Sequence, residues 1–218
     1  MVPGILTSTR TGRGALLIFG LLAPVACFDP GEAPELESGA GSTTDAAAES
    51  SGEDESSAAV DPCPQYCELI GDHCEPDLAQ YSGQVICEAT CALMDPGEQG
   101  DVLGNTASCR LHHAVLAAES PEPHCLHAGP TGDTTCGGPC ESFCSLAQEA
   151  CPGELSPFGS TDACIAECES WNPEPRYVTT VQSGDSYACR MYHLTLAAVQ
   201  PGEHCSHIPT DSPVCFDP

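Results

Sequence analysis

The chain has 218 residues, of which 17 are cysteine, and it carries a formal net charge of −27 at neutral pH. Cysteine at this density is typical of disulfide scaffolds and indicates an oxidising compartment. Five arginines face 32 acidic residues, and lysine is absent from the sequence. Such an acidic surface repels phosphate backbones, so nucleic-acid binding by charge neutralisation is excluded. We expect a neutral or cationic partner, either a protein or a small ligand, whose identity the sequence does not give.

Residues 1–27 have the pattern of an export signal. Arg10 and Arg13 precede the apolar stretch ALLIFGLLAPVA, which is too short to span a bilayer. The segment ends in LLAPVAC, which resembles the lipobox of bacterial lipoproteins, where the cysteine is diacylated and becomes the mature N-terminus. We therefore expect Cys27 to anchor the protein to a membrane through lipid. Phe28 after it favours an outer-membrane or cell-surface location; a periplasmic or secreted protein is the alternative.

Residues 28–61 are expected to form an acidic, disordered tether. The segment contains ten acidic residues and no basic one, and it consists mainly of small and polar residues. Such a composition cannot bury enough apolar surface to offset the entropy lost on ordering.

The remaining sixteen cysteines form two sets of eight with nearly the same spacing. The intervening gaps are 3, 6, 12, 3, 17, 15 and 10 residues in the first set and 3, 6, 12, 3, 20, 15 and 9 in the second. This agreement indicates an internal duplication. We assign repeat 1 to residues 62–137 and repeat 2 to residues 138–218, which leaves Cys27 as the odd cysteine, consistent with its lipidation.

Proline, glycine and cap residues predict a small all-α, disulfide-rich fold. Each repeat should contain a disulfide-stapled helical hairpin, a third helix and a cysteine-rich loop. Asn105 and Thr106 in repeat 1, and Asp185 and Ser186 in repeat 2, are competent N-caps for the third helices, which are expected to stop before the next proline. Tyr66, Phe143 and Leu116 are among the side chains expected in the two cores.

The spacing of the first cysteines in each repeat predicts two bridges. In an antiparallel helical hairpin, facing residues have a constant sum of residue numbers. This condition pairs Cys63 with Cys91, Cys67 with Cys87, Cys140 with Cys168 and Cys144 with Cys164. The pairing of Cys74, Cys109, Cys125 and Cys136, and of their counterparts in repeat 2, stays open among many alternatives.

Histidines recur at equivalent positions in both repeats. The third helix and its exit carry His113, His124 and His127 in repeat 1, and His193, His204 and His207 in repeat 2. One interpretation is a three-nitrogen site for zinc or copper in each repeat, because imidazole suits both metals. The other is structural: the histidines pack against disulfides and donate hydrogen bonds to carbonyls. The structural interpretation implies no cofactor.

The pattern C-R-x-[HY]-H…H-C-x-H-A-G-P-x-G…C-G, from Cys109 to Gly137, resembles a cysteine-rich domain of predicted bacterial lipoproteins. Repeat 2 keeps CRMYH and HCSH but lacks the Ala-Gly-Pro. The resemblance covers both repeats. It implies no catalytic residue, because no activity is established for such domains.

The longest cysteine gap of repeat 2 contains Trp171, Arg176 and Tyr177, which are expected to form an exposed binding patch or a partly packed surface loop. No motif for a nucleophile elbow, a phosphate loop, an EF-hand or a Cys-x-x-Cys pair is present, so we expect no enzymatic activity. The sequence thus favours an exported, lipid-anchored binding or structural module. The alternatives are an extracytoplasmic metal-binding protein and, less directly, a redox role for a labile bridge.

Overall fold

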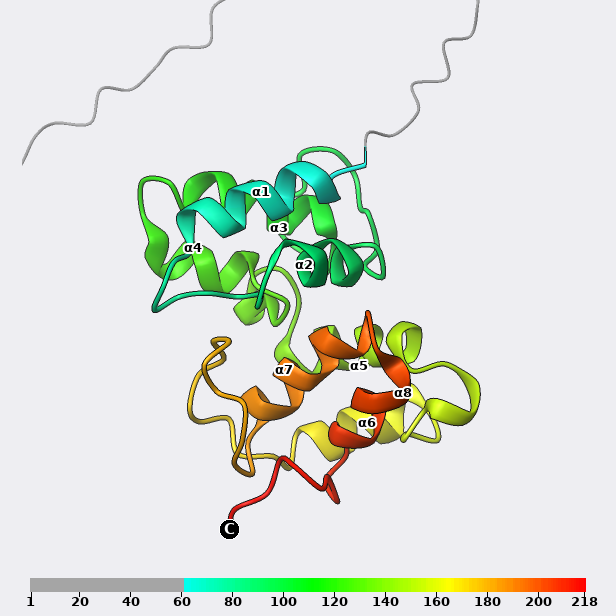
Figure 1. Cartoon of the computed structure of the whole chain (residues 1–218). Helices are drawn as coiled ribbons and strands as arrows, with labels where there is room; N and C mark the ends of the chain where they lie inside the picture. Colours follow the sequence, from blue (N-terminus) through cyan, green and yellow to red (C-terminus); the bar gives the residue numbers. More distant parts are fainter. Residues whose placement is uncertain (1–60) are drawn as a thin grey trace, which may run out of the picture. The chain divides into compact units, whose positions relative to one another are not determined.

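The computed structural model describes residues 61–218, which form helices joined by loops (Figure 1). The predicted signal segment with Cys27, and the predicted tether except Asp61, lie outside the described residues. Within residues 61–218 no β-strand forms, and no helix is long and apolar enough to cross a lipid bilayer. The prediction of a small all-α, disulfide-rich fold is confirmed.

Each repeat contributes a similar series of helices. In repeat 1 these are α1 (Cys63–His73), α2 (Gln84–Cys91), α3 (Ala107–Leu116), α4 (Pro121–Ala128) and the 3₁₀ turn η1 (Gly132–Thr134). In repeat 2 they are α5 (Pro139–Ala150), η2 (Gly153–Leu155), α6 (Thr161–Cys168), α7 (Tyr187–Ala197), α8 (Pro201–His204) and η3 (Cys205–His207).

Hydroxyl caps fix where the third helix of each repeat begins. Thr106 Oγ1 accepts a hydrogen bond from the Cys109 backbone amide at 3.1 Å, and Ser186 Oγ accepts one from the Cys189 amide at 3.3 Å. These contacts satisfy one of the amides that a helix N-terminus leaves without a partner. Of the two candidate caps expected for each helix, Thr106 and Ser186 are the ones that form the cap.

Two disulfides close the first helical hairpin of each repeat. In repeat 1 the bridges are Cys63–Cys91 and Cys67–Cys87, and in repeat 2 they are Cys140–Cys168 and Cys144–Cys164. These are the pairs expected from the constant sum of residue numbers, because cysteines four apart on one helix meet cysteines four apart on its antiparallel neighbour.

Two further disulfides connect each hairpin to the rest of its repeat. Cys74, at the end of α1, is joined to Cys125 on α4, and Cys151 is joined to Cys205 in the same way. Cys109, in the first turn of α3, is joined to Cys136 after η1, and Cys189 is joined to Cys215. Both repeats thus share one connectivity, and sixteen of the cysteines are oxidised.

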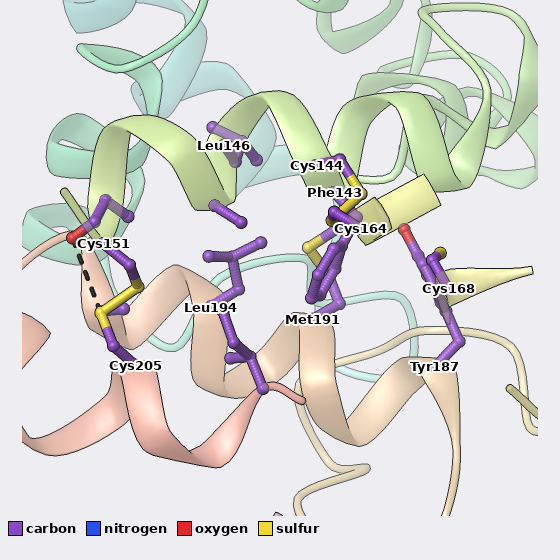
Figure 2. Packing of buried hydrophobic residues seen from close by; sticks show 14 of the residues in the cluster. Phe143, Cys144, Leu146, Cys151, Cys164, Cys168, Tyr187, Met191, Leu194 and Cys205 are labelled. Carbon is purple, nitrogen blue, oxygen red and sulfur yellow. Dashed lines mark hydrogen bonds between the residues drawn. A yellow bond between two sulfur atoms is a disulfide. The ribbon is translucent and has the colours of Figure 1, made fainter. Parts of the chain in front are cut away.

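The cores of the two repeats are built around these sulfurs. In repeat 1, Tyr66 is fully buried and its hydroxyl donates to the Ala128 carbonyl at 2.6 Å. Repeat 2 has the larger aromatic and aliphatic content. Figure 2 shows Met191 and Leu194 of α7 facing the side of α5 that carries Phe143 and Leu146.

The structure differs from the sequence-based expectation at the exit of the third helix. The sequence predicts a loop after Pro121, but this segment forms α4 in repeat 1, and its counterpart forms α8 with η3 in repeat 2. Proline ends one helix and is also favoured in the first turn of the next. Leu116 is predicted in the core but is 38% exposed, because Ala114 and Ala117 take the buried face of α3.

A fully buried arginine connects helix and loop in each repeat. The Arg110 guanidinium donates to the carbonyls of Gly129, Pro130 and Thr106 and to Asn105 Oδ1 at 2.8 Å. Burial lowers the pKa of Arg110 from its ordinary value. These contacts tie the first turn of α3 to the chain that follows α4.

Arg190 has the same role in repeat 2. It donates to backbone carbonyls and, at 2.7 Å, to Asp185 Oδ1. Asp185 occupies the position of Asn105, so a carboxylate in repeat 2 replaces a neutral amide in repeat 1.

Contacts also join the two repeats. The Tyr177 hydroxyl donates to the Gln80 carbonyl at 3.0 Å, and the Thr179 amide donates to the Ala79 carbonyl at 3.0 Å. Met94 packs against the buried residues of both cores. Repeat 2 therefore covers part of repeat 1 with its long inter-cysteine segment.

Removing a bridge should destabilise the protein according to the loop that it closes. The Cys67–Cys87 bridge spans 20 residues and Cys74–Cys125 spans 51, for which chain entropy gives about 3 and about 4 kcal/mol. We expect the Cys74→Ala/Cys125→Ala variant to lose more free energy of unfolding than Cys67→Ala/Cys87→Ala in urea titrations. A larger loss of free energy of unfolding in the Cys67→Ala/Cys87→Ala variant would contradict this ranking of the two bridges by loop length.

Exchanging the arginine partners should change stability in opposite directions. Asn105→Asp supplies repeat 1 with the charged acceptor that repeat 2 has, so we expect the free energy of unfolding to rise by about 1 kcal/mol. Asp185→Asn should lower it by a similar or smaller amount, since the Asp185 side chain is 53% exposed. Denaturant unfolding of the two matched variants measures both effects; changes of the same sign would argue against this role of the arginines.

Candidate metal centres

The six histidines predicted from the sequence come together as two groups of three, which we call triad 1 and triad 2. Triad 1 consists of His113 on α3 and His124 and His127 on α4. Triad 2 consists of His193 on α7, His204 on α8 and His207 on η3. Within each triad, one ring nitrogen from every histidine lies within 4.8 Å of the others.

Helix periodicity and the disulfides position triad 1. His113 lies four residues after Cys109 and therefore shares the helix face that is bridged to Cys136. His124 and His127 are three residues apart on α4, so their side chains project on the same side. Cys125, between them, is bridged to Cys74 on α1 and holds α4 in place.

The Nδ1 atoms converge in both triads. In triad 2, His193 Nδ1 lies 3.2 Å from His204 Nδ1 and 3.4 Å from His207 Nδ1. In triad 1, the Nδ1 atoms of His113 and His124 are 2.9 Å apart. Nitrogens bound at about 2.05 Å to a tetrahedral zinc ion lie about 3.3 Å from one another.

The two triads also have the same ring arrangement. The rings of His113 and His124 are stacked with an interplanar angle of 23°, and the rings of His193 and His204 make an angle of 30°. The ring of His127 stands nearly perpendicular to that of His113, and the ring of His207 nearly perpendicular to that of His193. The ring centroids are 4.9 Å apart in both pairs. Two segments with different neighbouring residues therefore reach one geometry.

Atoms outside triad 1 orient its rings. His113 Nε2 lies 3.3 Å from the Val102 carbonyl, to which it donates, so that in the neutral ring Nδ1 carries the lone pair. His127 Nε2 lies 3.9 Å from Asp133 Oδ2, which places the other nitrogen of this ring toward the triad. A carbonyl or carboxylate behind the ring is the usual outer contact of a metal-binding histidine.

Burial and mutual repulsion favour neutral imidazoles. Burial, followed by repulsion from His207 and His204, lowers the pKa of His193 to about 4. Burial also lowers the pKa of His204, against the opposing effect of Glu203. In triad 1, burial lowers the pKa of His113 and of His127, although Asp133 acts in the opposite direction on His127. Neutral imidazole is the form that binds metal.

The packing interpretation leaves one ring nitrogen of triad 1 without a partner. His127 Nδ1 is buried and forms no hydrogen bond. Buried polar atoms are normally satisfied, and the exceptions need an explanation. The sulfurs of Cys109 and Cys136 also lie near His113, but they form a disulfide and are not available as thiolate ligands.

The remaining two histidines lie outside the triads. His73 Nδ1 contacts the Ala114 carbonyl at 3.0 Å, which links α1 to α3. His112 precedes His113 on α3, and its ring meets that of His113 edge-on. Neither belongs to a group of three potential ligands within residues 61–218.

The expected exposed patch of Trp171, Arg176 and Tyr177 is not present as such. Trp171 is 6% exposed and Tyr177 is 3% exposed, whereas Arg176 is exposed. Trp171 packs edge-on against Phe143 and lies under the Arg190 guanidinium, so its ring belongs to the core. The Tyr177 ring is covered because its hydroxyl reaches into repeat 1. The segment from Trp171 to Tyr177 therefore contains two packed aromatic residues and an exposed arginine.

Two contributors to triad 1 were not predicted from the sequence. Val102 acts through its carbonyl, which leaves no side-chain signal. Asp133 could have been noticed, because it is the acidic residue in the loop between His127 and Cys136.

Comparison with known proteins identifies a family. The BfoA family C-terminal domain matches the chain twice, over residues 36–141 and 138–217. Each match contains one set of eight cysteines and one histidine triad. No curated protein matches the chain, and no solved structure matches it. The chain therefore belongs to the protein family that is defined by the BfoA family C-terminal domain.

Proposed function

We propose that this protein is an extracytoplasmic binding module that holds one transition-metal ion, preferably zinc, in each repeat. The observation that supports this function best is the convergence of three imidazoles at equivalent positions of both repeats, with the same ring geometry. The module is proposed to bind rather than to catalyse.

The nitrogen spacing of triad 2 favours zinc over copper, whereas the 2.9 Å between His113 Nδ1 and His124 Nδ1 in triad 1 is shorter than the edge of a tetrahedral zinc site. The distances of 3.2 and 3.4 Å in triad 2 match the edge of a tetrahedron around zinc. Copper(II) binds imidazole more tightly than zinc does, but it prefers square-planar or tetragonal sites. Three protein nitrogens leave a fourth position for water or for a group from a partner.

The oxidised cysteines explain why histidine would supply the ligands. In an oxidising compartment, paired thiols are consumed by disulfides, and imidazole remains available as a nitrogen ligand. The depressed pKa values of His113, His127, His193 and His204 keep these rings unprotonated at neutral pH. A metal ion would then meet preformed sites with little competition from protons.

We also propose that the protein is a lipoprotein. Sixteen cysteines are paired within residues 61–218, which leaves Cys27 in its lipobox-like context as the residue for diacylation. The anchor would hold the repeats at the outer membrane or cell surface, with the acidic residues 28–61 as a spacer; a periplasmic or secreted form is the alternative.

Metal content tests the proposed centres directly. We expect the purified, disulfide-intact chain, incubated with zinc and then dialysed, to retain two zinc ions by elemental mass spectrometry. His124→Ala should leave one ion, His207→Ala should leave one, and the double variant should leave none, because each change removes one of three ligands. His124 and His207 are half-buried rather than core residues, so these variants should keep the fold.

His112→Ala provides the matched control for the metal measurement. It removes a half-buried imidazole that packs edge-on against the His113 ring but belongs to neither triad, and it should retain both zinc ions. If wild type retains no zinc above the dialysis buffer, or if His112→Ala loses as much zinc as His124→Ala, the proposal is wrong.

The metal-free protein should lose stability in acid because of triad 2. His193 has a pKa of about 4 in the folded chain, against about 6.5 in the unfolded chain. Between these values the unfolded chain binds the proton that the folded chain refuses, so the free energy of unfolding falls as the pH is lowered, by up to about 3 kcal/mol.

The loss of free energy of unfolding can be measured by urea unfolding of the chelator-treated chain between about pH 4 and about pH 6.5. His193→Gln, whose side chain does not titrate, should show a shallower dependence. An NMR titration of wild type that places the His193 midpoint near that of a free imidazole would contradict the attribution to this residue.

A further inference from the structure

A second candidate site is formed by a cavity that none of the triad histidines lines. It has a volume of about 350 Å³, which is within the range of sites for small organic ligands. Leu126, Thr131 and Asp133 of repeat 1 line one part of it, and residues of repeat 2 between Pro139 and Tyr187 line the rest. The cavity is therefore formed where the two repeats meet.

The walls of this cavity are aromatic and offer few free polar groups. Trp171, Tyr177 and Tyr187 line it, together with Leu126 and proline residues. The polar atoms of the three aromatic side chains already have partners. Trp171 Nε1 donates to Thr210 Oγ1, the Tyr177 hydroxyl to the Gln80 carbonyl and the Tyr187 hydroxyl to the Pro139 carbonyl. What remains for a ligand is the small part of each ring that reaches the cavity, since Trp171, Tyr177 and Tyr187 are 6%, 3% and 8% exposed.

The charges around the cavity are predominantly negative. Three carboxylates line it, those of Asp133, Glu169 and Glu174, against the single guanidinium of Arg176. Glu169 and Glu174 are exposed, and Asp133 is half-buried, so they lie toward solvent rather than beneath the aromatic walls. A ligand with an apolar body and a positive group matches this combination, since aromatic faces and carboxylates both attract cations.

We propose that the cavity binds a small organic cation with an aromatic body, such as an arylalkylammonium ion. The body lies against Trp171, Tyr177 and Tyr187, and the ammonium group lies among the carboxylates. This site does not rest on the metal proposal, because none of the six triad histidines lines the cavity.

The chain carries its own reporter, since Trp171 is its single tryptophan. Titrating the disulfide-intact chain with phenethylamine, without added metal, should produce a saturable change in tryptophan fluorescence. For a ligand of this size we expect a Kd on the order of 0.1–1 mM. Phenethyl alcohol and hydrocinnamate, which have nearly the same shape but are neutral and anionic, should bind at least about fivefold more weakly.

Variants separate the proposed contacts from general charge effects. The Glu169→Gln/Glu174→Gln double variant should weaken phenethylamine binding by about tenfold, because it removes two of the three carboxylates. Glu154→Gln, an exposed acid that does not line the cavity, should bind as wild type does. Unchanged circular dichroism of the variants shows that the fold is kept.

Three results would overturn the proposal. These are the absence of a saturable response to phenethylamine, an equal response to the amine and the alcohol, and wild-type affinity in the double variant. Because the titration uses no metal, a failure of amine binding leaves the zinc proposal to its own test.

Discussion

The arrangement of this protein depends on the covalent connection between its first hairpin and the segments that carry histidine. Cys125 lies between His124 and His127 and is joined to Cys74 at the end of α1. Cys109 lies one helical turn before His113 and is joined to Cys136. The bridges therefore hold both histidine-bearing helices of a repeat at fixed points. A domain of this size with few large apolar residues needs such cross-links in place of a larger core.

The buried arginines complete the constraint that the bridges begin. A guanidinium with no solvent contact must place its donors on protein acceptors, and Arg110 uses the carbonyls of Thr106, Gly129 and Pro130 for this purpose. These acceptors belong to the start of α3 and to the chain just after α4. The arginine thus limits how far the two histidine-bearing helices can separate, and Arg190 does the same in repeat 2.

Features that depend on local periodicity were predictable from the sequence, whereas features that depend on long-range packing were not. The hairpin bridges followed from cysteines four apart on antiparallel helices. The partner of Cys74 did not, because it lies on α4, whose helical state was not predicted. Triad membership was visible because the same histidines recur in both repeats. Burial of Trp171 was not, since it depends on its contacts with Phe143 and Arg190.

The duplication has produced two triads with one ring geometry but different surroundings. Within residues 61–218, His127 alone among the six triad histidines has a carboxylate oxygen in ion-pair contact, that of Asp133. The final loop of repeat 2 is one residue shorter, and triad 2 has two buried histidines, His193 and His204, where triad 1 has one, His113. A carboxylate behind an imidazole increases its basicity as a ligand, whereas burial removes competition from protons.

Burial therefore favours neutral imidazoles in both triads, and triad 1 adds a carboxylate contact, so we expect the two proposed metal sites to respond differently to pH and salt. Asp133 gives repeat 1 a further distinction, because the same side chain lines the acidic cavity. A cation bound there would compete with His127 for this carboxylate, which would connect the cavity electrostatically to the proposed metal centre of repeat 1. The same side-chain link cannot form in repeat 2, where the sequence between His207 and Cys215 carries its acid at Asp211, outside ion-pair contact with the triad.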